Sequence, residues 1–150
     1  MLYYFQIKAT GTCNYGIWLQ GGSSVRIAGI DFAACVFGHI VCQGYSYIDA
    51  TGNYTISGGS QFHWYADTGG MIIIANRTIT ISNTPAFTGS FAYATVIGGI
   101  SCGGNTFVGS ATGTHYGAVN GGGINTGGGG INYLPGDVGT GSATSPGWYA

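Results

Sequence analysis

The sequence predicts an all-β protein: a right-handed parallel β-helix, or β-solenoid, whose turns repeat about every 24 residues. Three observations support this class. The β-branched residues number 39 of 150 (16 Ile, 7 Val and 16 Thr) and the aromatic residues number 21, and both kinds favour strands. Glu is absent and Leu occurs three times, so residues that favour helices are scarce. Similar residues also recur at a regular step, which is typical of a solenoid.

Short extended segments separated by glycine pairs account for most of the chain up to residue 109. Runs of β-branched and aromatic residues end at turn signals such as Gly21-Gly22 and Gly69-Gly70. No apolar pattern of helical period persists. The expected strands are Gly16–Gln20, Val25–Phe32, His39–Gln43, Tyr45–Ala50, Asn53–Ser57, Gln61–Ala66, Met71–Ala75, Arg77–Ser82, Ser90–Ile97 and Thr106–Gly109.

Two series of residues carry the repeat. Within each series the members are separated by one full period: Tyr15, His39, His63 and Phe87, and Ser24, Ile48, Ile72 and Val96. In a parallel β-helix such residues stack in ladders, one from each turn. We therefore expect Ile48, Ile72 and Val96 inside the molecule, in one stack that excludes Tyr47. A β-sandwich, which also places strands about every 8–12 residues, is the alternative.

The chain carries very little charge, which restricts its partners. Charged residues make up 5% of the sequence, against about 25% in an ordinary domain. A net charge of −1 provides no basic patch, so nucleic acid is not an expected partner. No apolar run approaches the roughly 20 residues of a membrane-spanning helix, so membrane insertion is not expected. A monomer with so few charges would expose large apolar patches, and this favours a homotrimer that buries them.

The composition changes near residue 109, which divides the chain into an expected all-β body, 1–109, and a Gly-rich end, 110–150. From position 117 onward, Gly accounts for about a third of the sequence. The piece Gly-Gly-Gly-Ile-Asn begins at Gly121 and again at Gly128. Because Gly has no side chain to bury, this end suits close contact with partner chains, and a flexible tail is the alternative. The expected assembly residues are Gly128, Gly129, Gly130, Ile124, Ile131, Trp148 and Tyr149.

Four segments within 110–150, a stretch of about a quarter of the chain, form a recognisable pattern: Ser110–Tyr116, Gly123–Gly129, Tyr133–Gly136 and Gly147–Ala150. The pattern resembles the C-terminal part of phage and prophage tail-fibre or tail-spike proteins. The resemblance implies a homotrimeric β-helical module of a virion tail appendage, made in bacterial cytoplasm and joined to other tail or fibre proteins. It also implies a structural role combined with recognition of a cell-surface polysaccharide.

Aromatic side chains are the candidates for binding such a glycan. Sugar rings stack on Trp and Tyr, whose polar groups supply hydrogen bonds at the same surface. The candidate residues are Trp64, Tyr65, Tyr45 and Tyr47. Because successive residues of a strand point to opposite faces, we expect Trp64 to face away from both His63 and Tyr65.

A polysaccharide depolymerase on the same scaffold is an alternative function. Glycoside hydrolysis needs two carboxyl groups about 5–10 Å apart. The weak catalytic candidates are Asp49 and Asp67, with His63 as helper, and the absence of Glu argues against an acid of raised pKa. A purely structural trimerisation cap is the third possibility.

Neither a metal nor a cofactor is expected. His39 and His63, stacked one turn apart, suit a shared metal, but an aromatic ladder with Tyr15 and Phe87 is the favoured interpretation. The four cysteines, at 13, 35, 42 and 102, form no Cys-x-x-Cys pair. Buried, reduced thiols are favoured over a disulfide.

Overall fold

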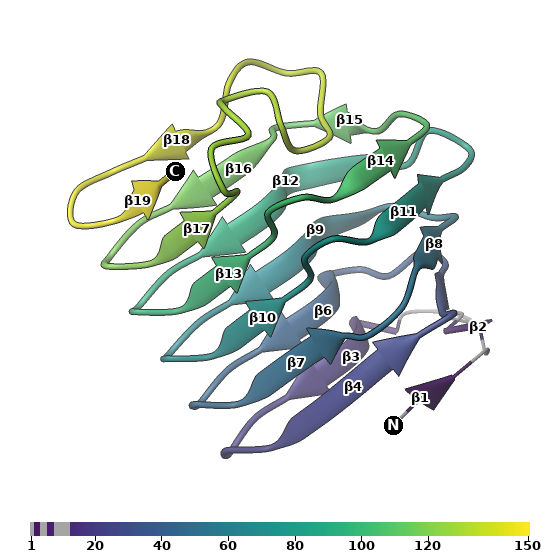
Figure 1. Ribbon diagram of the computed structural model, residues 1–150, viewed down its shortest axis with the longest axis horizontal. Coiled ribbons are helices and arrows are strands. Elements are labelled where there is room, and N and C mark those ends of the chain that lie inside the picture. Colours follow the sequence, from purple (N-terminus) through teal and green to yellow (C-terminus); the bar gives the residue numbers. More distant parts are fainter. Residues whose placement is uncertain (1, 4–5, 8–12) are drawn as a thin grey trace.

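The protein is a parallel β-solenoid. A computed structural model describes residues 2–3, 6–7 and 13–150. These residues contain strands and no helix, and the strands form three parallel sheets, A, B and C (Figure 1). Each turn passes from sheet C to sheet A and then to sheet B, and the described strands complete about six turns. The expected parallel solenoid is therefore confirmed and the β-sandwich is excluded.

Each sheet is built from strands of successive turns. Sheet A contains β1 (Leu2–Tyr3), β4 (Ser24–Ala28), β7 (Tyr47–Ala50), β10 (Met71–Ile73), β13 (Gly99–Ser101), β17 (Gly123–Asn125) and β19 (Trp148–Tyr149). Sheet B contains β2 (Gln6–Ile7), β5 (Asp31–Phe32), β8 (Tyr54–Ile56), β11 (Thr78–Ile81) and β14 (Thr106–Val108). Sheet C contains β3 (Tyr15–Leu19), β6 (Gly38–Cys42), β9 (Ser60–Ala66), β12 (Ala86–Ala94), β16 (Tyr116–Ala118) and β18 (Ser142–Ala143), and β15 (Thr112–Gly113) pairs with β12.

One turn of the solenoid is longer than its neighbours. Tyr47 pairs with Met71, and Met71 pairs with Gly99. The number of residues from Met71 to Gly99 is four larger than the number from Tyr47 to Met71. The next step, from Gly99 to Gly123, returns to the length of the first. The extra residues therefore enter between β10 and β13.

The extra residues are absorbed gradually along this turn. At β11, where Ile79 pairs with Tyr54, the step between paired residues is already one position longer than at β10. At the start of β12, where Phe87 pairs with Ser60, the step is two positions longer again. An irregularity in the ladder between Phe87 and Ser90 takes up the fourth. This local bulge preserves the stacking on either side of it.

An aliphatic ladder runs through the core behind sheet A. Its members pair in register from turn to turn and are Val25, Ile48, Ile72, Ile100 and Ile124. Ile48 and Ile72 are fully buried, as predicted. The prediction for Val96 was wrong, since its side chain is 45% exposed in a turn. Ile100 replaces it because the long turn shifts the register by four positions.

Two further strand predictions are corrected by the backbone. The segment predicted as one strand, Val25–Phe32, is divided into β4 and β5 at Gly29, whose φ is 65°. Only a residue without a Cβ adopts this left-handed conformation at little cost. The strand predicted at Ser90–Ile97 instead runs from Ala86 to Ala94, and Val96 and Ile97 form a turn.

The turns from sheet C to sheet A follow one design, and together they form an edge that we call the corner. In each of five successive turns two adjacent residues have positive φ: Gly21-Gly22, Gly44-Tyr45, Thr68-Gly69, Val96-Ile97 and Asn120-Gly121. Backbone hydrogen bonds such as Gly70 N–H to Asp67 O close these turns. The pair Val96-Ile97, with φ of 44° and 58°, contains neither Gly nor Asn and is strained, because β-branched residues disfavour positive φ.

The Gly-rich end continues the solenoid and then closes it. Strands β16 and β17 pair with β12 and β13, so the stacking continues past residue 109. The segment between β17 and β18 arches over the last turns (Figure 1). Its Leu134 is buried in the core, and the Tyr133 hydroxyl accepts a hydrogen bond from Asn105 N–H and donates one to Cys102 O. Terminal turns of solenoids need such a cover because no further turn buries their apolar side chains.

Burial of the aliphatic ladder generates a prediction. Ile72→Ala leaves a cavity in the stack and is expected to destabilise the fold by about 2–5 kcal/mol. Ile73→Ala is the matched control, because Ile73 is the adjacent residue on the outer face and is only partly buried. Urea unfolding measures both. Equal losses from the two substitutions would contradict the placement of Ile72 inside.

Candidate functional site

A cluster of aromatic and imidazole rings occupies the core between sheets B and C. His39 and His63, from β6 and β9, are fully buried, and their Nδ1 atoms lie 2.9 Å apart. Phe32 stacks on His39 with 5.6 Å between the ring centroids. On the other side, Phe91 pairs with His63 at 4.9 Å. The predicted stack of His39 and His63 is present, but the rest of the predicted ladder was wrong: Tyr15 pairs with Gly38, and Phe91 takes the place expected for Phe87.

Hydrogen bonds link the four polar side chains of this cluster. The indole N–H of Trp64 only donates, and it bonds to the Tyr54 hydroxyl at 3.1 Å. The Tyr54 hydroxyl shares a second hydrogen bond with Nε2 of His63, at 2.8 Å. The hydrogen bond between the two Nδ1 atoms requires that one of them carries a proton and the other does not.

Burial keeps the two histidines neutral. It lowers the pKa of His39 to about 4, an effect that the nearby carbonyls of Ala33 and Gly59 and the charge of Asp31 only partly oppose. Burial lowers the pKa of His63 well below its usual value, and the neighbouring His39 lowers it further. His63 is thus enclosed in the core, where it cannot reach a substrate at the surface.

The two candidate carboxylates lie on different sheets. Asp49 is on the outer face of sheet A, with its Oδ2 3.7 Å from Arg26 Nε. Asp67 follows β9 of sheet C and accepts hydrogen bonds from Gln43 and Thr68. No hydrogen bond or ion pair among the described residues joins Asp49, Asp67 and His63. The geometry does not assemble them into an acid pair with a helper.

The predicted glycan-binding residues do not share one surface. Trp64 is fully buried and offers no ring face to a sugar. The expectation that it faces away from His63 was wrong, because both residues point into the core and both bond to Tyr54. Tyr65 does face outward and is partly exposed. Tyr45 lies on the corner and is 73% exposed.

Tyr65 belongs to a group of rings on the outside of sheet C, which we call the aromatic face. Its members are Tyr15, Trp18, Phe37, Phe62, Tyr65 and Tyr93. Tyr65 and Tyr93 pair in register and their rings stack, with an interplanar angle of 7° and centroids 5.7 Å apart. Phe37 makes edge contacts with Phe62 and Tyr65. The rings form one continuous surface over successive turns.

Polar groups border the aromatic face. The Trp18 side chain is 46% exposed, and its indole N–H donates to Gln43 Oε1 at 2.8 Å. Gln43 Nε2 in turn donates to Asp67 Oδ2 at 3.0 Å. Burial, together with the charges of Asp67, Tyr93 and Tyr15, raises the pKa of Tyr65, so its hydroxyl stays protonated and able to donate. Ring faces and hydrogen-bonding groups therefore share one surface.

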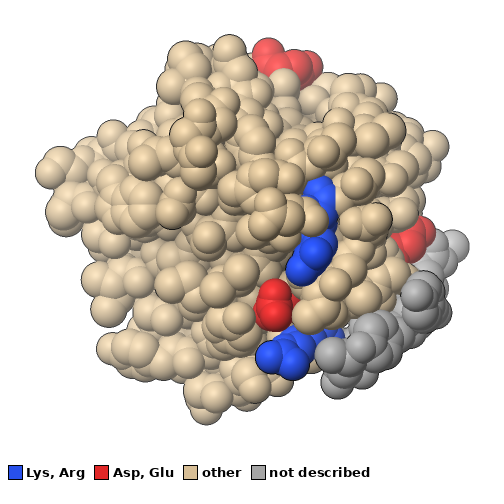
Figure 2. Space-filling model, viewed as in Figure 1, with Lys and Arg blue, Asp and Glu red and all other residues tan. Residues whose placement is uncertain are grey.

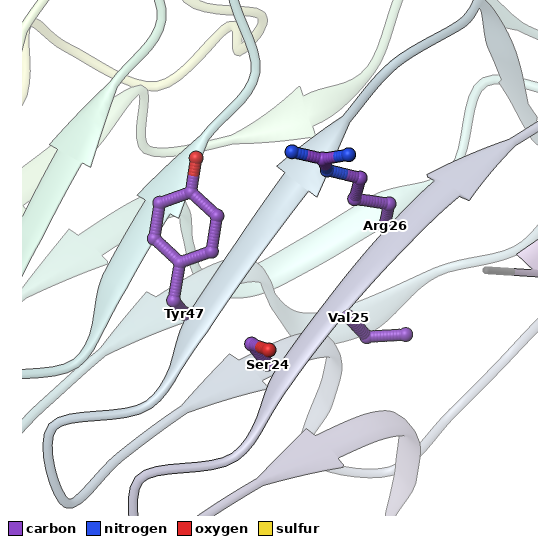
Figure 3. Close-up of a pocket in the computed structure, with 4 residues that line it drawn as sticks. All are labelled: Ser24, Val25, Arg26 and Tyr47. Carbon is purple, nitrogen blue, oxygen red and sulfur yellow. The ribbon is translucent and has the colours of Figure 1, made fainter.

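Tyr47 lies on the opposite side of the solenoid, on sheet A. It lines an open hollow of about 380 Å³ with Ser24, Val25 and Arg26. Figure 3 shows the Tyr47 ring and the Arg26 guanidinium on the same side of their strands. Arg26 and Asp49 are part of a small charged area on this face, and the left-hand side of the same view is uncharged (Figure 2).

The predicted assembly residues serve several roles within the chain. Ile124 is fully buried in the core, and Tyr149 stacks on Tyr116 with centroids 3.6 Å apart. Ile131 and Trp148 are about half exposed, at 54% and 48%. These two residues remain available to a neighbouring molecule.

The three predicted assembly glycines lie in the covering segment. Gly128 and Gly130 have φ of 85° and 81° and have open space around the Cβ position. The need for Gly at these two positions is therefore conformational. A Cβ on Gly129 would clash with the Tyr133 ring.

The described residues contain no group of three or more His, Cys, Asp or Glu side chains that could hold a metal. Cys13, Cys35, Cys42 and Cys102 are all free thiols. Burial raises the pKa of Cys42 to about 11 and that of Cys102 to about 12, which keeps both protonated. A helix of sufficient length and hydrophobicity to span a membrane is not found in the part of the chain that the structure describes.

Comparison with known proteins gives no relative. No protein-family model matches the chain, and neither a curated protein nor a solved structure matches it.

Sequence reasoning missed most of the aromatic face. Trp18, Val41, Tyr65 and Tyr93 occupy equivalent positions in successive turns, but the longest step between them exceeds the shortest by five positions. A search that allowed the step to vary by this amount would have found the column. The fixed step led to the interior histidines instead.

The buried histidines predict acid sensitivity. The unfolded chain binds protons near the usual histidine pKa of about 6.5, whereas the folded chain does so only at lower pH. The contribution of the two neutral histidines to the free energy of unfolding is therefore fully present above pH 6.5. It falls as the pH drops toward 4, by about 1.4 kcal/mol per pH unit for each histidine. Urea unfolding between pH 7 and pH 5, where carboxylates titrate little, measures this loss.

The control is the double variant His39→Phe with His63→Phe, which removes both titrating groups and keeps aromatic rings in the stack. Its stability should change little over the same range. Nitrogen NMR of the wild type provides a second measurement and should show both imidazoles neutral at pH 5. A wild type equally stable at pH 5 and pH 7 would refute the assignment.

Proposed function

We propose that the protein is a structural and host-recognition module of a phage tail fibre or tail spike that binds a cell-surface glycan. The observation that carries the proposal is the aromatic face of sheet C. Its exposed and partly exposed rings pack around the buried Phe62. Bordered by amide, carboxylate and hydroxyl groups, they match a sugar, which has apolar C–H faces and a rim of hydroxyl groups.

The solenoid scaffold supports this role. Strands of successive turns lie about 4.8 Å apart, so equivalent side chains repeat along the axis at nearly that interval. Trp18, Tyr65 and Tyr93 thereby present ring surfaces over several turns of the molecule. An extended polymer of sugar units suits such a linear surface better than a single compact ligand does.

Binding without cleavage is favoured over depolymerisation. Asp49 lies on sheet A and Asp67 in the turn after β9, they have separate polar partners, and His63 is enclosed in the core. A homotrimer remains part of the proposal, because the chain has few charges and exposes residues such as Ile131 and Trp148. Its place on a tail appendage rests on the resemblance of the Gly-rich end.

Removal of the exposed rings should weaken glycan binding. We expect the double variant Trp18→Ala with Tyr65→Ala to bind bacterial surface polysaccharides at least roughly tenfold more weakly, a loss of about 1.4 kcal/mol. A glycan array identifies the ligand for the wild type, and calorimetry measures the change. Reducing-end release from the same polysaccharide, measured in parallel, would instead indicate a depolymerase.

Val108→Ala is the control, because Val108 is 50% exposed but lies on sheet B, outside the aromatic face. It should bind the glycan like the wild type. If the double variant retains full affinity, or if Val108→Ala weakens binding equally, the aromatic face is not the site.

A further inference from the structure

Two apolar projections and two hollows lie side by side at the same heights along the solenoid. The projections are turns of the corner, carrying Tyr45 in one turn and Val96 with Ile97 in another. The hollows are on the adjacent outer face of sheet A. Tyr47, two residues after Tyr45, lines one hollow, and Gly99, two residues after Ile97, lines the other. Each projection therefore shares one turn of the solenoid with the hollow that follows it.

The upper hollow is formed by glycines between two large side chains. Met71, Gly99, Gly123 and Trp148 stack in register on the outer face of sheet A. The Met71 thioether lies against Gly99 and the Trp148 indole against Gly123, where added Cβ atoms would clash with them. The hollow between them is about 170 Å³ and contains no charged group. It is smaller than the roughly 300 Å³ of a drug-sized ligand site and suits one apolar side chain.

The projection beside it has unusual features for an exposed turn. Val96 and Ile97 are 45% and 62% exposed, although both are apolar and both have positive φ. Each β-branched residue in this conformation costs on the order of 1–2 kcal/mol, and Asn-Gly or Gly-Gly would avoid that cost. The neighbouring turns do use Gly or Asn. Neither strain nor exposure stabilises a lone molecule, so this turn is a candidate for contact with another molecule.

We propose that a second copy of this chain inserts its Val96-Ile97 turn into the Met71–Trp148 hollow of its neighbour. The lower projection, Tyr45, then enters the larger hollow of Ser24, Val25, Arg26 and Tyr47 in the same neighbour. The inference rests on the self-assembly in the proposed function and specifies its interface.

A projection and a hollow at one height suit a second copy of this chain. When parallel solenoids are related by rotation about an axis along their length, residues meet at equal heights. A projection and a separate hollow on one surface form a head-to-tail contact, which closes into a ring when the rotation closes. Three copies give the homotrimer. The contact uses the corner and sheet A, whereas the aromatic face lies on sheet C.

Charge substitution tests this contact. Ile97→Lys places an ammonium group in the apolar hollow and should convert the trimer to a monomer, measured as mass in solution by light scattering. Val108→Lys is the control, because Val108 is 50% exposed but lies on sheet B. It should remain trimeric. Thermal melting of each variant shows that the chain is folded.

A second substitution identifies the partner surface. Met71→Asp alone should also give a monomer, and combined with Ile97→Lys it should restore the trimer by opposite charge. The proposed interface would be overturned if the wild type is a monomer or if Ile97→Lys remains a trimer. It would also be overturned if Met71→Asp is a trimer and the double variant stays a monomer. Glycan affinity of the monomeric variants is measured separately, so a failure of the interface and a failure of the binding proposal are distinguishable.

Discussion

Backbone hydrogen bonding between successive turns is the constraint on which the rest of this structure depends. Each strand pairs in parallel with the equivalent strand one turn earlier, so a residue must lie directly over its counterpart. An error of one residue would move an entire apolar set to the outside. Any change in turn length must therefore be absorbed between strands or by a bulge within a ladder, as between Phe87 and Ser90.

The same stacking explains how the core tolerates histidine. A lone buried imidazole would leave polar atoms without partners, at a cost of a few kcal/mol. Stacking brings His39 over His63, and Tyr54 and Trp64 extend the hydrogen bonds on the other side. In the next turn Phe91 takes the position, so the polar network does not continue into that turn. The network ties sheets B and C together at the centre of the molecule.

The class of fold could be predicted from the sequence because similar residues recur in each turn of the solenoid. The stack of Ile48 over Ile72 followed directly from the constant step of the repeat. Val96 was misplaced because turn length is set by local insertions that leave no signal in a fixed-step search. Trp64 was misplaced because strict alternation fails where β9 brings two successive side chains inward. The Gly-rich end was interpreted as contact between chains, but Ile124, Leu134 and Tyr149 serve the chain's own last turns.

The distribution of polar and apolar groups over the three sheets then limits what each surface does. Charge is the usual source of solubility, and this chain has almost none. Hydroxyl and amide groups replace it on most of the surface, but large apolar side chains remain exposed at the corner and on sheet A, among them Tyr45, Ile97 and Trp148. Such residues on a rigid scaffold cannot retreat into the core, because every inner position of the ladder is already filled. Burial against another molecule would remove them from water, and the proposed contact between copies of this chain does so with the corner and sheet A.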